Sequence, residues 1–351
     1  MKVRTLIPFV AVLFAAFAFA VQSRAQSPLV TIDTVAVGDP GNVADTTGYG
    51  AVADVFAIGK YEVTIGQYST FLNSVASVTS DSYIVNLWNA NMATDLNIAG
   101  ISRSGDGSLA SPYIYSVIGP SGITPAGASS AGNRPISYVS WFDAARFANW
   151  MNNGATNGAS TETGAYTLNG STSGVDFTKN AGATWWIPSE DEWYKAAYYK
   201  GGGTNAGYWD YPTQSDSAPG NNIGGAENQA NHYYDSFSVT DQTGFVHPAQ
   251  NYLSDAGAFA NSEGAYGTYD QGGNVFEWND TVIDSSRGAR GGSWRDRGGI
   301  ALHQGWRGFL LPTEENPDTG FRVATVPEPS TYALLLMTGA GALWLARRKR
   351  D

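Results

Sequence analysis

The sequence contains no cysteine in its 351 residues. This absence excludes disulfide bonds, cysteine nucleophiles, zinc–thiolate sites and copper(I) held by soft sulfur. If the protein is exported, its stability must come from a packed core and from any ions that it binds.

Basic residues and histidines are also scarce. Residues 26–326 hold 13 Lys and Arg against 29 Asp and Glu, a net charge of −16, compared with −11 for the whole chain. We therefore expect no nucleic-acid partner, because phosphate binding needs a positive surface. The three histidines, His232, His247 and His303, are scattered and do not indicate a non-haem iron site. Serine-hydrolase and nucleotide-binding motifs are absent from the sequence.

Glycine and aromatic residues are abundant. The chain has 42 Gly, 19 Tyr, 15 Phe and 11 Trp, and only 15% of its residues are charged. This composition is typical of a loop-rich globular protein in which aromatic side chains supply much of the packing. A chain of this length could hold two domains, but one domain over 26–326 can bury a large core, so we predict a single domain.

Both ends of the chain resemble targeting segments. Residues 1–25 begin with Lys2 and Arg4, continue through LIPFVAVLFAAFAFAV and end in small residues, which predicts a signal peptide cleaved before Gln26. Cleavage after Ala20 is the alternative. Residues 327–351 contain TYALLLMTGAGALWLA followed by RRKRD. This hydrophobic run predicts a short membrane helix with its basic end in the cytoplasm and the folded domain outside.

Three short helices are predicted from capping boxes, in which a hydroxyl and a side chain three residues later satisfy free backbone donors. The pairs are Thr64 with Gln67, Ser140 with Asp143, and Ser189 with Glu192. Apolar residues follow each pair at helical spacing. The segment 30–63 alternates strand-like runs with turns and predicts a β-hairpin or meander. The polar stretches 76–133 and 154–183 are predicted to be long surface loops.

The stretch TYDQGGNVFEW places Asp270, Gly273, Val275 and Glu277 at relative positions 0, 3, 5 and 7. Two carboxylates and main-chain carbonyls around a glycine turn suit a hard cation such as calcium. Two alternatives stay open: an ordinary turn, and a Glu277 that pairs with a nearby arginine.

Arginines gather near the C-terminal end of the domain. They are Arg287, Arg290, Arg295, Arg297, Arg307 and Arg322. We interpret them as partners that neutralise acidic loops, with an anion-binding patch as the alternative.

Six ordered motifs carry a family resemblance. They are KYEVTIGQYSTF, RPISYVSWFDAARFANWMN, WIPSEDEWYKAA, DQGGNVFEW, RGGSW and GFRVA. Together they resemble the motif series of the sulfatase-modifying-factor, or formylglycine-generating-enzyme, family over roughly residues 30–326. At the C-terminus, Pro-Glu-Pro, a hydrophobic run and an arginine cluster resemble the PEP-CTERM sorting signal. A plain membrane anchor is the alternative.

The resemblance implies a loop-rich α+β domain with a C-type lectin-like fold and bound calcium. By position, Asp270 and Glu277 would supply side-chain oxygens, and Gly273 and Val275 carbonyls, to one calcium. A second calcium site would involve Asn231 and the carbonyl of His232, with remaining ligands between 241 and 245. The sorting signal implies an exosortase-type partner, transient membrane attachment, and export to the cell envelope or exterior.

Catalytic members of this family bind copper(I) through two cysteines, and Asp296 and Ala301 occupy those positions here. We therefore expect no copper and no formylglycine-generating activity. The sequence favours a ligand-binding or envelope- or matrix-associated module that takes a glycan or a protein. An enzyme with cysteine-independent chemistry is the alternative, for example one using Asp296 beside an arginine. The candidate ligand-binding residues are Trp294, Arg295, Asp296, Arg297 and Trp306.

Overall fold

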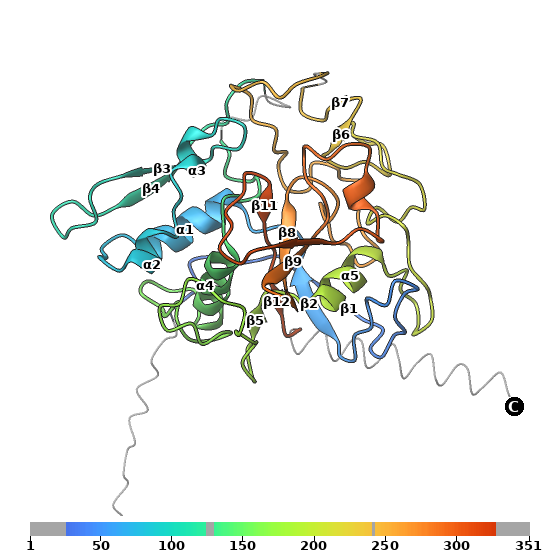
Figure 1. The fold of residues 1–351 in the computed structure, drawn as a ribbon, viewed down its shortest axis with the longest axis horizontal. Helices are drawn as coiled ribbons and strands as arrows, with labels where there is room; N and C mark the ends of the chain where they lie inside the picture. The colour runs from blue at the N-terminus through green and yellow to red at the C-terminus, as the bar shows by residue number, and fades with distance from the viewer. Residues whose placement is uncertain (1–25, 124–129, 241–242, 328–351) are drawn as a thin grey trace, which may run out of the picture.

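A computed structural model describes residues 26–123, 130–240 and 243–327 (Figure 1). The predicted signal peptide and the predicted membrane helix lie outside these ranges. Among the described residues, no helix combines the length and apolarity needed to span a bilayer.

The first sheet joins the two ends of the domain. Its strand order is β1-β2-β12-β5, and every pairing is antiparallel. The strands are β1 (Thr34–Val37), β2 (Phe56–Gly59), β12 (Ala324–Thr325) and β5 (Trp185–Trp186). The antiparallel pairing of β1 with β2 confirms the hairpin predicted for 30–63. Since β12 lies between β2 and β5, the last described strand is a central one.

The second sheet carries the motifs singled out in the sequence. Its order is β10-β9-β8-β11, with β11 parallel to β8 and the other pairs antiparallel. The strands are β10 (Gly308–Leu310), β9 (Ser286–Arg290), β8 (Phe276–Ile283) and β11 (Thr319–Gly320). A short 3₁₀ helix, η2 (Ile300–Leu302), lies between β9 and β10 in sequence.

The three predicted helices are confirmed with both halves of each capping box. They are α1 (Ile65–Val75), α4 (Trp141–Asn152) and α5 (Glu190–Tyr198). Thr64, Ser140 and Ser189 each accept a hydrogen bond from the backbone N–H three residues on. The apolar spacing also holds, because the predicted inward face of each helix is largely buried.

The prediction of a continuous loop over 76–133 is wrong in part. This stretch contains α2 (Ser82–Val85), α3 (Asn91–Thr94), and a hairpin of β3 (Ile101–Ser104) with β4 (Ile114–Val117). The hairpin projects from one side of the molecule (Figure 1). Burial of Ile101 and Tyr115 against the core stabilises elements whose own sequence signals are weak. The stretch 154–183 holds no helix or strand, as predicted. A further two-residue pair, β6 (Tyr233–Tyr234) with β7 (Ser236–Phe237), lies in the 220–255 region.

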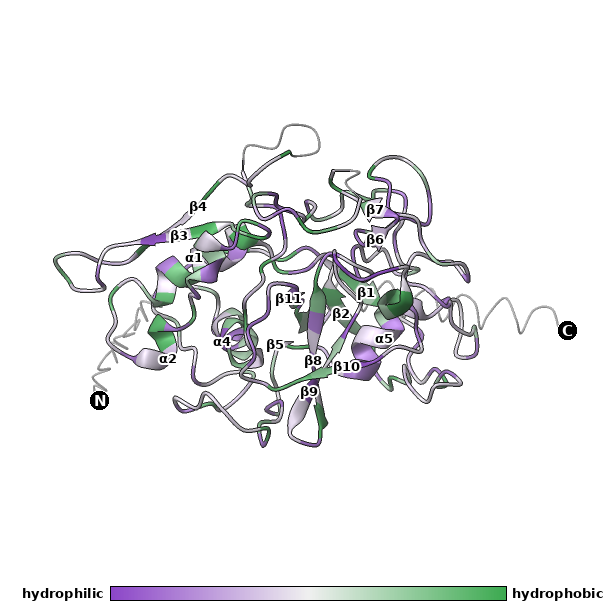
Figure 2. Ribbon diagram, turned by 45° about the horizontal axis from the view of Figure 1, so that its top comes forward, coloured by the Kyte–Doolittle hydropathy of each residue, from purple (hydrophilic) through white to green (hydrophobic). Residues whose placement is uncertain are grey.

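The core is largely aromatic and lies between α1, α4 and the first sheet. Phe71, Phe147 and Trp150 contact one another with ring centroids 5.3–5.8 Å apart, and Phe321 packs edge-on to Phe147. Figure 2 shows how few and how short the regular elements are relative to the connecting segments. The observed mixture of small sheets and few helices confirms the predicted α+β class.

Candidate functional site

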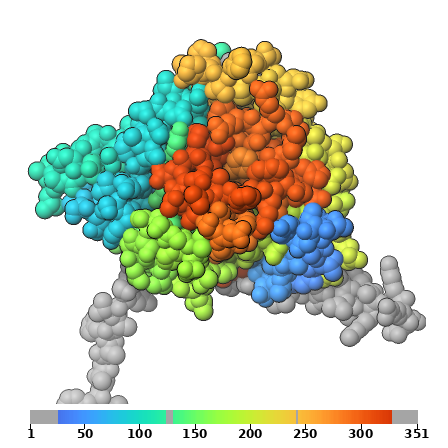
Figure 3. Space-filling view, in the orientation of Figure 1, coloured from blue at the N-terminus to red at the C-terminus, as the bar shows by residue number. Residues whose placement is uncertain are grey.

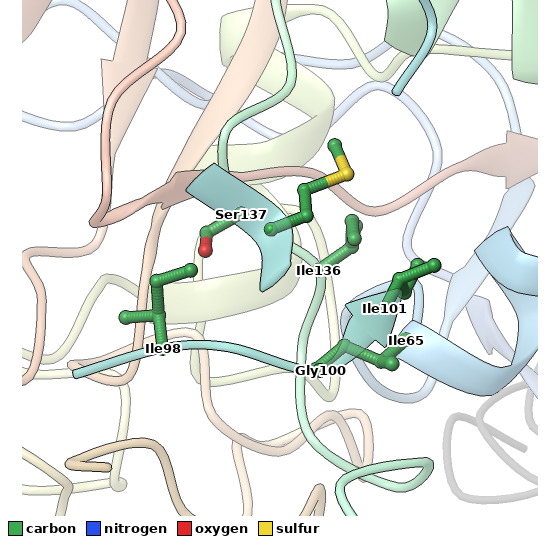
Figure 4. A pocket seen from close by; sticks show the side chains of 7 residues that line it. Ile65, Ile98, Gly100, Ile101, Ile136 and Ser137 are labelled. Carbon is green, nitrogen blue, oxygen red and sulfur yellow. The ribbon is translucent and has the colours of Figure 1, made fainter. Parts of the chain in front are cut away.

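One cavity in the described part of the chain is a core packing defect. It is lined by Ile65, Ile98, Ile101, Ile136 and three smaller or flexible neighbours (Figure 4). The space is too narrow for a water molecule. An apolar void of this size does not bind a ligand.

A groove of 410 Å³ lies along β10 and the start of β8. Phe276 and Trp306 form its aromatic part, with ring centroids 5.1 Å apart and an interplanar angle of 28°. Phe309 also lines the groove, and 63% of its surface is exposed. The C-terminal segments from which the groove is built occupy the middle of the face seen in Figure 3.

Two arginines border this groove, and carboxylates hold each of them in place. Arg295 donates from Nε to Oδ2 of Asp318 at 2.7 Å, and its side chain is still 49% exposed. Arg307 donates from Nε and Nη2 to both oxygens of Glu190, at 2.6–3.0 Å, and its side chain is 30% exposed. Fixing a guanidinium in this way lowers the entropy lost when it binds an anion.

Glu190 is the first residue of α5, and it is shared between two arginines. Arg290 donates from Nε to Oε1 of Glu190 at 2.8 Å, beside the bonds from Arg307. One carboxylate therefore holds two guanidinium groups, of which only Arg307 lines the groove, and the charge of Asp191 also acts on Arg307.

The predicted ligand-binding residues separate into three environments. Arg295 and Trp306 line the groove. Trp294 is buried, with 2% of its surface exposed, and its ring stacks on Tyr252 at 5.0 Å. Trp294 is therefore a core residue, and its ring is covered by Phe237 and Tyr252.

Asp296 and Arg297 lie outside the groove lining. Asp296 Oδ2 accepts hydrogen bonds from the backbone N–H and the hydroxyl of Ser293, both at 2.7 Å, so this carboxylate closes a local turn. Arg297 is exposed and lies over the ring of Tyr233, 4.8 Å from its centroid.

The interpretation of the six arginines as charge-neutralising partners is supported for five of them. Arg287 pairs with Asp280, Arg290 and Arg307 with Glu190, Arg295 with Asp318, and Arg322 with Glu277. Within the described part of the chain, Arg297 forms no ion pair.

Glu277 pairs with an arginine, one of the alternatives that the sequence left open. Arg322 donates to both of its oxygens at 2.5 and 2.6 Å, and the indole N–H of Trp193 donates to Oε2 at 2.7 Å. Both partners of the ion pair are fully buried. Arg322 also donates to the carbonyls of Gly59 and Tyr269. Two of these donors bond to Oε2 and one to Oε1, and the role of Glu277 as a calcium ligand stays a prediction.

Asp270, which is half-buried, lies near a buried carboxylate, Glu62. Burial, followed by the charge of Asp270, raises the pKa of Glu62 well above its usual value, and neither Glu62 oxygen has a hydrogen-bond partner. Burial also raises the pKa of Asp270 to about 6, although its Oδ2 accepts from the N–H of Gly257. If Glu62, Asp270 and Glu277 are ionised, three carboxylates face the one guanidinium of Arg322. Such an excess of buried charge is costly and must be relieved by protons or by a bound cation.

This electrostatic situation fits calcium, and it adds Glu62 to the predicted ligand Asp270. Orphaned Glu62 oxygens and the carboxylate of Asp270 are the hard donors that calcium prefers. Nowhere in the described residues do three or more His, Cys, Asp or Glu side chains converge as metal ligands. Calcium here would therefore need main-chain oxygens or water as well. Gly273 and Val275 remain predicted carbonyl ligands.

The residues predicted for the second calcium site lie close to Gly273. The N–H of Asn274 donates to the carbonyl of Asn231 at 2.8 Å, and Gly273 forms a backbone bridge with Asn231. The carbonyl of His232 accepts hydrogen bonds from the Asn221 amide and from a serine hydroxyl, both at 3.2 Å. These hydrogen bonds occupy the carbonyl oxygen of His232, which is the atom predicted to bind calcium. Residues 241 and 242, where further ligands were expected, lie outside the described residues.

Comparison with protein families decides the identity of the domain. The family model for the sulfatase-modifying factor enzyme 1-like domain matches residues 34–326. The chain belongs to this family. The PEP-CTERM protein-sorting motif matches residues 325–350, so the chain carries an export signal of the kind that exosortase sorting machinery recognises. This signal places the protein in the cell envelope or outside the cell.

Solved structures resemble this sulfatase-modifying-factor domain over most of its length. CarF is 22% identical, with 85% of this chain and 99% of that chain covered and a TM-score of 0.45. Variable protein 1 from Treponema denticola is 17% identical, with 84% of this chain and 95% of that chain covered and a TM-score of 0.44. PvdO from Pseudomonas aeruginosa is 16% identical, with 84% of this chain and 92% of that chain covered and a TM-score of 0.40. A search of curated proteins finds no significant match.

The sequence did not predict several residues that line the groove or that lie with Asp270, Glu277 and Arg322 in the buried charged cluster. Glu62 lies within the KYEVT motif, where a lone acid on a buried strand-like run is the signal that could have marked it. Phe309 follows no motif, and its exposure depends on the edge position of β10. Asp318 and Glu190 act only through arginines distant in sequence, and spacing alone does not reveal such pairs.

Proposed function

We propose that this exported sulfatase-modifying-factor-like domain is a binding module whose groove takes an acidic glycan. The observation that carries the proposal is the combination of anchored guanidinium groups with aromatic rings. Arg295 and Arg307 would pair with carboxylates of the glycan, and the ring of Phe309 would pack against a sugar face. The alternative of an enzyme that uses Asp296 receives less support, because both donors of Ser293 hold that carboxylate in a turn.

The test is a titration of the mature domain with a uronic-acid oligosaccharide and its neutral counterpart. Arg295→Gln should weaken binding of the acidic ligand by roughly tenfold, the value expected for one charge-assisted hydrogen bond. Phe309→Ala should also weaken it, at little cost in stability, because Phe309 is mostly exposed. Arg297→Gln is the matched control, since Arg297 is an exposed arginine outside the groove. Equal losses in Arg295→Gln and Arg297→Gln, or no preference for the acidic ligand, would refute the proposal.

We also propose that calcium stabilises the fold through Glu62 and Asp270. The supporting observation is the buried excess of negative charge around two carboxylates, one of which has no hydrogen-bond partner. Calcium should raise the melting temperature of the mature domain, and a chelator should lower it. Glu62→Gln should abolish this calcium response and should melt at a higher temperature than the metal-free wild type. A melting temperature that changes with neither calcium nor chelator, together with no calcium detected by native mass spectrometry, would refute this assignment.

We further propose that the hydrophobic run of the sorting segment attaches the protein transiently to the membrane before processing. This proposal rests on the sequence of residues 331–346 and the basic residues that follow.

A further inference from the structure

The guanidinium group of Arg307, which borders the groove and pairs with Glu190, also lies over an aromatic ring. This ring belongs to Tyr49, and the guanidinium carbon of Arg307 lies 5.2 Å from its centroid. Arg290, the second arginine bonded to Glu190, lies over the same ring at 4.8 Å and over the ring of Tyr194 at 4.9 Å. The two arginines and two tyrosines therefore form a cation–π cluster that extends from the buried Tyr194 to the edge of the groove.

Tyr49 comes from a segment that is far from the groove in sequence, and hydrogen bonds hold this segment in place. The N–H of Gly50 donates to Oδ1 of Asp191 at 2.8 Å, and the Gly50 carbonyl accepts from the Asn42 amide at 2.7 Å. The N–H of Asp45 donates to the Tyr49 carbonyl at 2.8 Å. In Figure 3 this N-terminal segment, drawn in blue, adjoins the C-terminal segments, drawn in orange and red. The Tyr49 ring therefore has a defined position beside the two arginines.

The contacts of Arg307 leave part of its guanidinium group available to a ligand. Nε and Nη2 donate to Glu190, and within the described ranges Arg307 forms no other hydrogen bond. Because an arginine carries five N–H groups, both N–H groups of Nη1 and one of Nη2 remain. Paired donors in one plane suit a carboxylate. The charge of Asp191 also acts on Arg307, so directed hydrogen bonds, more than an excess of positive charge, would hold a ligand there.

We propose that Tyr49 is a positioning residue of the groove, whose ring holds the Arg307 guanidinium against Glu190 with its free N–H groups available to the ligand. This inference rests on the proposed binding of an acidic glycan, and it names a residue outside the groove lining that sets the affinity. Without the ring, Arg307 samples more orientations, and ordering it again on binding costs free energy. Both arginines contact the ring of Tyr49, so phenylalanine should replace this residue and leucine should not.

The first test examines Arg307 in the mature domain without any ligand. Phenylglyoxal modifies accessible guanidinium groups, and peptide mapping by mass spectrometry gives the rate of modification at Arg307. We expect Tyr49→Leu to raise this rate about two- to fivefold, the range expected for a partly exposed cation–π contact, and Tyr49→Phe to leave it unchanged. The rate at Arg295, which Asp318 holds, is the internal reference and should change in neither variant.

The second test is titration with the uronic-acid oligosaccharide and its neutral counterpart. Tyr49→Leu should weaken binding of the acidic ligand about two- to fivefold and should leave any binding of the neutral ligand unchanged. Tyr49→Phe should bind both ligands as the wild type does. Tyr113→Leu is the matched control, because Tyr113 is also half-buried and has Arg103 over its ring at 4.5 Å, but it does not line the groove. This variant should change neither measurement.

Three results would overturn this role for Tyr49. The first is an Arg307 modification rate in Tyr49→Leu equal to that of the wild type, and the second is a Tyr49→Phe variant that behaves like Tyr49→Leu. The third is an equal loss of affinity for the acidic and neutral ligands, because the groove would then have changed as a whole. If the wild type shows no preference for the acidic ligand, the proposed function fails, and the modification rates still decide whether Tyr49 fixes Arg307.

Discussion

Replacing Arg322 by methionine should destabilise the domain more than any other removal of a single charge. Arg322 and Glu277 are both fully buried, and their bonds measure 2.5 and 2.6 Å. Without Arg322, the Glu277 carboxylate stays buried with only the Trp193 indole as donor. The carbonyls of Gly59 and Tyr269 also lose a donor.

The expected cost follows from what the substitution leaves behind. Breaking a buried ion pair by removing one partner typically costs about 3–5 kcal/mol. A domain has about 5–15 kcal/mol of stability in total, so this loss is large. Replacing both partners removes the stranded charge, and the double variant Glu277→Leu/Arg322→Met should therefore be more stable than Arg322→Met alone.

Urea unfolding of the mature domain, followed by tryptophan fluorescence, measures these differences. A chelator should be present, because a cation could otherwise compensate the freed carboxylate. Lys200→Met is the control: its pair with Asp216 has side chains that are 33% and 58% exposed, and the loss should stay below about 1 kcal/mol. An Arg322→Met variant within about 1 kcal/mol of wild type, or a double variant no more stable than the single one, would refute the reasoning.

Three further predictions concern the fold. Burial and, to a smaller extent, the charge of Asp143 raise the pKa of Glu315 to about 7. The protonated carboxyl therefore stabilises the folded state fully below its unfolded pKa of about 4.3, and this contribution is lost as the pH rises towards 7. Glu315→Gln should flatten this decline in a pH series of urea midpoints, and an unchanged slope would contradict the assignment. Ser189→Ala should cost about 1 kcal/mol by removing the cap of α5, whereas Ser189→Asp should retain most of it, as thermal melting can show. Gly273→Ala should cost more than about 1 kcal/mol, because its φ is +84° and a Cβ would lie 2.2 Å from the Asn231 carbonyl oxygen; Gly154→Ala, with φ +92° and open space, should lose clearly less.

Local signals in the sequence were sufficient for the three longer helices, α1, α4 and α5, but not for the short helices α2 and α3. A capping box lies within four residues, and all three boxes formed as expected because their partners cannot be far apart. The β3–β4 hairpin was missed because its stability comes from core contacts of Ile101 and Tyr115. The burial of a single side chain was also hard to predict where a loop distant in sequence covers it. Trp294 is an example, because the ring of Tyr252 stacks on it.

The buried charges show the same limit. The sequence placed Glu277 near several arginines without selecting among them, because the selection depends on how β11 and the chain after it align with β8. It gave no indication that Glu62 would approach Asp270, since the two residues lie on segments far apart in the chain. The groove was anticipated only through Arg295 and Trp306, and its charge depends on carboxylates from other elements.

The central place of β12 also has a mechanical consequence for a protein whose sorting segment follows directly. Any tension on the C-terminal end is carried into a strand that is bonded on one side to β2 and on the other to β5. The same load reaches Arg322 two residues earlier, and through it Gly59 and Glu277. The sorting segment thus continues from the interior of the domain, where pulling must shear two ladders at once, and not from an edge strand that could peel away.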